Sequence, residues 1–126
     1  MIKKLVANVP GRVWEDGKPP HMRVWENEFN VASWIRISGA DGDLSLMVWH
    51  IDEAGEHTSL IDRTQIQGDG SALMSGLVRL RFTGKVELVQ VQLQLSDPAM
   101  RFNCDELFFQ RRGSSLKQDD KLISNF

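Results

Sequence analysis

The sequence has few of the features that cross-link a protein, anchor it in a membrane or direct its export. Its 126 residues include one cysteine, Cys104, so an internal disulfide is excluded and the fold does not depend on an oxidising compartment. No apolar run approaches the roughly 20 residues that span a bilayer. The apolar run after "MIKK" is too short for the core of a signal peptide. We therefore expect a protein made in the cytoplasm, without a secretion signal and without a membrane partner.

The chain also lacks a large net charge and has no tyrosine. The net charge of −2 gives no overall attraction to nucleic acid or to anionic lipid, so neither is expected as a partner. The chain has four tryptophans and no tyrosine. Sugar-binding surfaces commonly use both residues, so the absence of tyrosine weighs against a glycan-binding role.

No arrangement typical of an enzyme is found along the chain. His50 ends a predicted strand and His57 follows a glycine turn, and neither belongs to a Ser–His or Cys–His pattern. Both are expected to form hydrogen bonds in loops. The histidines and the single cysteine give no zinc spacing, and the glycines of "GDGSALMSG" follow no phosphate-binding spacing. The sequence predicts a protein that acts without catalysis.

Period-two alternation of apolar and polar residues is the dominant pattern, and it predicts an all-β protein. In "VELVQVQLQL" (86–95), valines and leucines alternate with glutamines, whereas residues 44–51 are apolar on both faces, as in a covered central strand. "TGK" (83–85) predicts a tight hairpin between its flanking strands. About seven or eight short strands joined by Gly-, Asp- and Pro-rich turns are typical of an antiparallel two-sheet β-sandwich of jelly-roll type.

The alternation of apolar and polar residues shifts by one position within the last predicted strand. Met100, Phe102 and Cys104 share one parity, whereas Leu107 and Phe109 share the other. A β-bulge at Asp105–Glu106 would reconcile them, because a bulge adds one residue to a strand. Cys104 then falls on the buried side, which is typical of a free cysteine.

The two ends differ in composition from the middle of the chain. Residues 1–21 contain three prolines and two glycines and are predicted to form an N-terminal arm. Residues 22–112 form the predicted sandwich domain, and residues 113–126 a C-terminal arm with apolar side chains that have little to pack against. We expect these side chains to bury against another chain: Leu116, Leu122, Ile123 and Phe126.

The predicted outer surface of the sandwich is rich in planar polar groups and an indole. If the strands pair as read, one face carries Trp34, Arg36, Arg79, Arg81, Gln90, Gln92 and Gln94. Tryptophan and arginine are enriched at the energetic centres of protein interfaces. Three interpretations of this face stay open: an ordinary solvated surface, a subunit interface and a glycan-binding surface.

The ending "VELVQVQLQLSDPAMRFNCDELFFQR" (86–111) resembles the last two strands of galactose-binding-like jelly rolls, which include many carbohydrate-binding modules. In that superfamily an acidic pair precedes the closing apolar alternation, and Asp105–Glu106 occupies this place. The resemblance implies a structural calcium ion on Asp105, and no other cofactor is expected. The remaining calcium ligands of the family have no counterpart that can be placed in this sequence.

In overall character the chain also resembles accessory structural proteins of tailed bacteriophage particles. Capsid decoration and tail proteins are often small, cysteine-poor jelly rolls with terminal arms. This resemblance implies a virion component made in the host cytoplasm. Its partners would be other copies of itself, for example in a trimer, and other structural proteins.

A carbohydrate-binding module is the alternative function. In this interpretation Trp34 or Trp49 would stack on a sugar ring. The partners for its hydroxyl groups would be Gln90, Gln92, Arg36 and Arg79. The absence of tyrosine, of a secretion signal and of a linker to a catalytic domain counts against this alternative.

Overall fold

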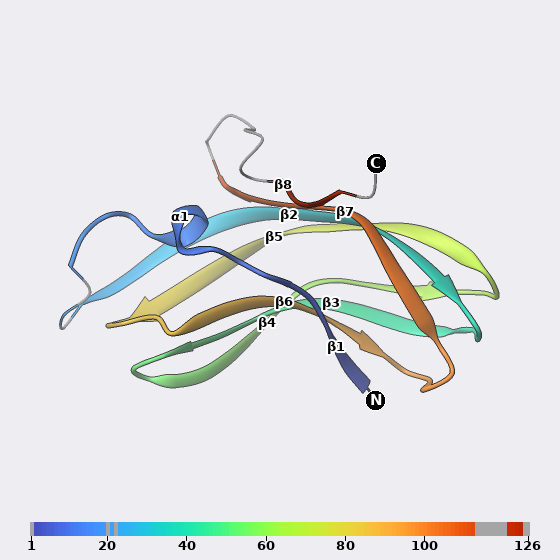
Figure 1. Cartoon of the computed structure of the whole chain (residues 1–126). Helices are drawn as coiled ribbons and strands as arrows, with labels where there is room; N and C mark the ends of the chain where they lie inside the picture. Colours follow the sequence, from blue (N-terminus) through green and yellow to red (C-terminus); the bar gives the residue numbers. More distant parts are fainter. Residues whose placement is uncertain (1, 20, 22, 113–120, 125–126) are drawn as a thin grey trace.

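The chain folds into two antiparallel sheets packed face to face, as a computed structural model of it shows (Figure 1). The structure describes residues 2–19, 21, 23–112 and 121–124. Sheet A has the order β1 (Ile2–Asn8), β6 (Leu88–Leu95), β3 (Gly42–Asp52) and β4 (Gly55–Ile66). Sheet B has the order β5 (Gly70–Thr83), β2 (Val24–Ser38), β7 (Arg101–Arg111) and β8 (Lys121–Ser124). The predicted two-sheet β-sandwich is confirmed.

Alternation along the strands builds the core between the sheets. In β6, Val89, Val91, Leu93 and Leu95 are buried while the three intervening glutamines are partly exposed. β3 lies between β6 and β4, which confirms the prediction of a central strand for residues 44–51. The largest fully buried side chains come from both sheets and include Phe29, Phe82, Phe109, Leu46 and Leu93. Their burial removes apolar surface from water, which is the main stabilising contribution in such a domain.

The strands before and after "TGK" do not form the predicted hairpin. β5 belongs to sheet B and β6 to sheet A, so residues 84–87 carry the chain from one sheet to the other. Local turn composition does not distinguish a hairpin from such a crossing. At the neighbouring edge β4 and β5 approach closely, because Gly76 lies against the backbone carbonyl of Ile61 with no room for a Cβ atom.

The N-terminal residues are part of the sandwich and not an arm, contrary to the prediction for residues 1–21. β1 pairs with β6, with Ile2 opposite Leu95 and Asn8 opposite Gln90. The short helix α1 (Gly11–Trp14) then places Trp14 in the core, where its ring centroid lies 5.6 Å from that of Phe82. Pro10 is the N-cap residue of α1, and Gly17 adopts a positive φ of 78° beyond the helix. No helix in the described part of the chain is long and apolar enough to cross a membrane.

The described part of the C-terminal segment also packs on its own domain. β8 pairs with β7, and Ile123 lies opposite Leu107. Leu122 and Ile123 are partly buried against the hydrophobic core, so their own domain covers part of the surface that the prediction assigned to another chain. An unpaired edge of β7 offers backbone donors and acceptors, which explains why the segment adds as a strand. Leu116 and Phe126 lie outside the described residues.

Candidate functional site

The residues predicted to share one face are divided between two opposite faces. Trp34 and Arg36 on β2 and Arg79 and Arg81 on β5 lie on sheet B. The three glutamines project from β6, so they lie on sheet A. The prediction of one continuous Trp/Arg/Gln face is therefore wrong. Alternation fixes which residues of a strand point outward, but not the sheet to which the strand belongs.

The bulge in β7 is the feature that shapes the outer face of sheet B. Trp34 pairs with Glu106 and Ile35 pairs with Cys104, so Asp105 is the extra residue of β7. This confirms the predicted bulge. On either side of it Cys104 and Leu107 are buried, whereas Asp105 and Glu106 are both partly exposed. The bulge thus places two consecutive carboxylates beside Trp34.

A hollow of about 470 Å³ lies at this place, and we call it the sheet-B hollow. It is lined by Ala32, Ser33, Trp34, Leu73, Asp105, Glu106 and Phe108. Trp34 is 43% exposed and Leu73, its cross-strand neighbour on β5, is 59% exposed. The volume falls within the range of about 300–1,000 Å³ that is typical of small-molecule sites. The hollow combines an exposed indole with polar groups at its rim.

Each carboxylate of the bulge has a cationic partner. The Arg36 guanidinium donates to Asp105 over 2.8 Å, and the Lys121 ammonium lies 3.4 Å from Glu106. Lys121 also lies 5.7 Å from the centroid of the Phe108 ring. The two carboxylates that line the hollow are therefore each paired with a cation, which leaves no large excess of either charge beside it. Such a rim suits an uncharged ligand with hydroxyl groups, because a hydroxyl both donates and accepts.

The calcium ion predicted on Asp105 gains no support from this geometry. Its carboxylate accepts a hydrogen bond from Arg36, and a cation on one side discourages a second cation on the other. Calcium takes six to eight oxygen ligands. Among the described residues, no group of three acidic or histidine side chains capable of holding a metal includes Asp105.

Arg79 and Arg81 lie at the other end of β5, away from the hollow's lining. Arg79 donates to Glu28 over 2.8 Å, and Arg112 donates to the other oxygen of the same carboxylate over 2.7 Å. The hydrogen bond from Arg79, and then that from Arg112, holds the pKa of Glu28 below its usual value. Arg79 is therefore part of an exposed salt-bridge network with Glu28 and Arg112.

The outer face of sheet A carries the predicted glutamines and a second tryptophan. Trp49 pairs with Gln90 on β6 and with Thr58 on β4. The amide of Gln90 donates to the side chain of Asn8 over 2.9 Å, and the amide of Gln92 donates to Gln90 over 3.2 Å. This face is a second candidate surface for a sugar. Trp49 is more covered than Trp34, and it does not line the sheet-B hollow.

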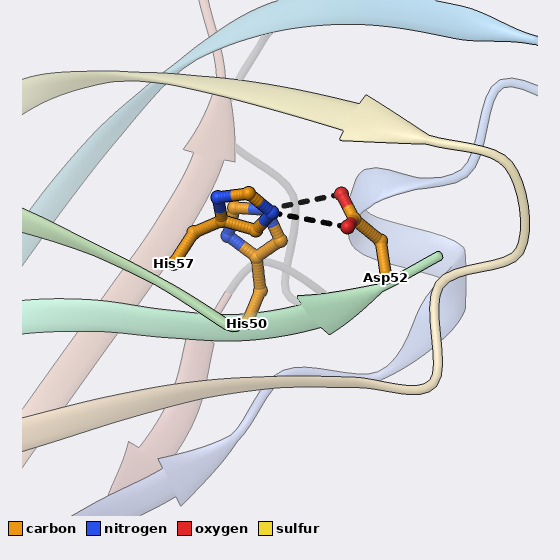
Figure 2. A group of neighbouring side chains, drawn as sticks. All are labelled: His50, Asp52 and His57. Carbon is orange, nitrogen blue, oxygen red and sulfur yellow. Dashed lines mark hydrogen bonds and ion pairs between the residues drawn. The ribbon is translucent and has the colours of Figure 1, made fainter. Parts of the chain in front are cut away.

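Two histidines face each other at the end of the β3–β4 hairpin, where the sequence predicted loops. His50 pairs directly with His57 across β3 and β4, and their rings stack with centroids 4.6 Å apart. Figure 2 shows both Nε2 atoms turned toward the Asp52 carboxylate. His57 Nε2 lies 3.0 Å from Asp52 Oδ1, and His50 Nε2 lies 3.6 Å from Oδ2. We call these three residues the Asp–His cluster.

Burial and hydrogen bonds set the charge states within this cluster. Burial lowers the pKa of His50, so this imidazole is neutral near pH 7. Burial alone would raise the pKa of Asp52, but hydrogen bonds from the Thr83 amide, His57 and the Ala54 amide outweigh it and lower that pKa. The cluster therefore places a neutral imidazole, His50, beside an anionic carboxylate, Asp52. Cross-strand register produces it, which the spacing along the sequence does not reveal.

Comparison with known proteins supports the fold. No family model and no curated protein sequence matches this chain. A solved structure similar to it contains the CBM22-1–GH10 modules of the Clostridium thermocellum N-terminal endo-1,4-β-D-xylanase 10B, complexed with xylohexaose. The similarity covers 72% of this chain and 18% of that much longer chain, with a TM-score of 0.52 and 11% sequence identity.

This similarity shows the fold alone. It agrees with the predicted jelly-roll type of β-sandwich. The predicted resemblance to bacteriophage structural proteins finds no support in these comparisons.

Proposed function

We propose that this domain binds a glycan in the sheet-B hollow, with Trp34 as the stacking platform and no reaction at the site. The observation that carries this proposal is the exposed indole next to the two bulge carboxylates and their cationic partners. The fold is similar to that of a protein whose structure holds CBM22-1 modules and xylohexaose, which supports a glycan over other uncharged ligands.

The chemistry of the hollow matches that of a sugar ring. One face of a pyranose presents C–H groups, which pack against the flat apolar surface of an indole. Leu73 and Phe108 extend the apolar surface on either side of Trp34. The Arg36–Asp105 pair supplies donors and acceptors for hydroxyl groups at the rim. Of the alternatives left open by the sequence, this assignment uses Trp34 and Arg36 and excludes Arg79, Gln90 and Gln92 from the same site.

A panel of soluble oligosaccharides tests the proposal. Xylohexaose, cellohexaose and mannohexaose are titrated into the full chain by isothermal titration calorimetry, and insoluble polysaccharides are tested by pull-down. We expect at least one glycan to bind with one site per chain. If every glycan of the panel fails to bind at millimolar concentration, the proposal is wrong.

Two tryptophan variants, one on each sheet, show which outer face binds the sugar. Trp34→Ala should weaken binding, whereas Trp49→Ala, which removes the indole from sheet A, should leave the affinity within about twofold. The reverse outcome would place the sugar on the glutamine face. Both variants are checked by circular dichroism, so that a loss of folding is not mistaken for a loss of binding.

An assembly interface is the second candidate function. Trp34, Leu73 and Leu77 are all exposed large apolar residues of sheet B, with Leu77 at 49% exposed. Exposed apolar groups of this kind are typical of protein interfaces as well as of ligand sites. Sedimentation of the purified chain distinguishes the two: an interface between copies predicts oligomers that Leu73→Asp dissociates, whereas the glycan proposal predicts a monomer with unchanged mass.

A further inference from the structure

The Asp–His cluster lies apart from the glycan-binding hollow, on the interior side of the β3–β4 hairpin end (Figure 2). His50 is 2% exposed, and its ring packs edge-on against Phe82 with centroids 5.0 Å apart. Asp52 is 6% exposed. A buried imidazole and a buried carboxylate are costly to desolvate, and the partly exposed His57 imidazole completes the group.

The three ligand atoms are already close to the spacing that a tetrahedral cation requires. They all lie within 4.8 Å of one another. Zinc binds imidazole nitrogen and carboxylate oxygen at about 2.0–2.2 Å, so adjacent ligand atoms in a tetrahedron are about 3.4 Å apart. The two N–O separations, 3.0 Å and 3.6 Å, lie on either side of this value.

The donor set selects the kind of metal. Two imidazole nitrogens and one carboxylate suit zinc and neighbouring transition metals, whereas calcium and magnesium prefer oxygen ligands in larger number. Asp52 is anionic, so it partly neutralises the cation. The side chain of His57 is 38% exposed, so solvent can reach the cluster from that side and supply a fourth ligand.

The surrounding backbone holds the ligands in place. The amides of Ala54 and Thr83 donate to Asp52 over 2.8 Å and 2.9 Å, one to each oxygen. A carboxylate oxygen has a second lone pair, so these bonds are compatible with a metal. His50 Nε2 lies 3.1 Å from the carbonyl oxygen of Arg81. In the metal-free chain Nε2 therefore carries the proton and donates to that carbonyl.

Metal binding requires this proton to move. When the ion occupies Nε2, the ring proton passes to Nδ1, and the neutral imidazole keeps one proton. His50 Nδ1 is buried and has no hydrogen-bond partner among the described residues, so it is open to the proton, and the hydrogen bond from Nε2 to the Arg81 carbonyl is exchanged for the bond to the metal. His57 undergoes the same change of tautomer near solvent.

We propose that His50, Asp52 and His57 form a binding site for a zinc-class divalent cation that cross-links strands β3 and β4 at the end of their hairpin. The role is structural, because the cluster is separate from the sheet-B hollow. The site is independent of the proposed glycan function, so either can fail without the other.

Zinc sulfate titrated into chelator-treated full-length chain tests the site by calorimetry. We expect one equivalent to bind, and we expect cobalt(II) to give the intense visible absorption of tetrahedral nitrogen and oxygen coordination. His57→Gln should weaken zinc binding about a hundredfold, in proportion to the loss of one of three protein ligands. The matched control is His21→Gln, which removes an exposed histidine outside the cluster and should not change the affinity.

A second measurement uses the unaltered protein, in case His57→Gln fails to fold. Long-range ¹H–¹⁵N spectra of the histidine rings report which nitrogen binds the metal. We expect zinc to shift the Nε2 resonances of His50 and His57 and to leave those of His21 unchanged. Absence of zinc binding at millimolar concentration, or equal shifts at all three histidines, would overturn the proposal.

Discussion

Replacing Trp34 by alanine should remove most of the glycan affinity and only part of the stability. Fully burying a tryptophan covers about 150–250 Å², so the 43% of Trp34 that is exposed offers about 100 Å² to a ligand. At about 25 cal/mol per Å² this area contributes at most about 2.5 kcal/mol to binding. A sugar ring stacked on one face of the indole covers about half of it. Since 1.4 kcal/mol is a factor of ten, we expect an affinity loss of about 10- to 60-fold.

Calorimetry of Trp34→Ala and of the unaltered chain against the same oligosaccharide gives this ratio directly. The free energy of unfolding, measured in urea, should fall by about 1–3 kcal/mol, less than for a fully buried core tryptophan, because Trp34 is 43% exposed and the variant loses only the packing of its covered part. An unchanged affinity in a folded variant would refute the reasoning. A larger fall in the free energy of unfolding would show that Trp34 serves the fold instead.

Three further predictions concern the scaffold. Gly76→Ala should lower the free energy of unfolding by about 1–3 kcal/mol, because the new methyl group meets a backbone carbonyl of β4. The control Gly70→Ala, whose Cβ would lie 3.4 Å from a side chain, should change it little. Urea denaturation of both variants checks this. The pKa of Glu28 is lowered by its hydrogen bond with Arg79, so the stability that Glu28 contributes is present above the ordinary carboxyl pKa and is lost as the pH falls through the folded-state value. The urea midpoint of Glu28→Gln should therefore vary less between neutral and acidic pH than that of the unaltered chain. An identical pH dependence of the two proteins would contradict the pairing. Burial raises the pKa of the Cys104 thiol, so a thiol reagent such as dithionitrobenzoate should label the native chain slowly and the urea-unfolded chain quickly. Fast labelling of the native chain would count against the buried position.

Features of the fold that depend on neighbours along the chain could be predicted from the sequence. Alternation identified the two-faced strands, and the parity change between Cys104 and Leu107 identified the bulge. The apolar pattern of residues 44–51 identified a central strand. Each of these signals is local, because strand parity and bulges are properties of one strand and its turns.

Features that depend on which strand pairs with which could not be predicted. The glutamines of β6 and Trp34 of β2 belong to different sheets, and period-two alternation carries no information about this. The proline-rich N-terminus reads as an arm, yet its first seven-residue strand is held by backbone pairing with β6. The Asp–His cluster depends on the register between β3 and β4, in which His50 meets His57.

The central claim is that a sugar lies in the sheet-B hollow, and ¹H–¹⁵N correlation spectra of the labelled chain test it most directly. The spectra are recorded during titration with the tightest-binding oligosaccharide of the panel. The account predicts that the largest shifts fall on the Trp34 indole and on the amides of Ala32, Asp105 and Phe108, while the Trp49 indole stays in place. Shifts centred on Trp49 and Gln90, or no shifts at all at saturating sugar, would contradict it.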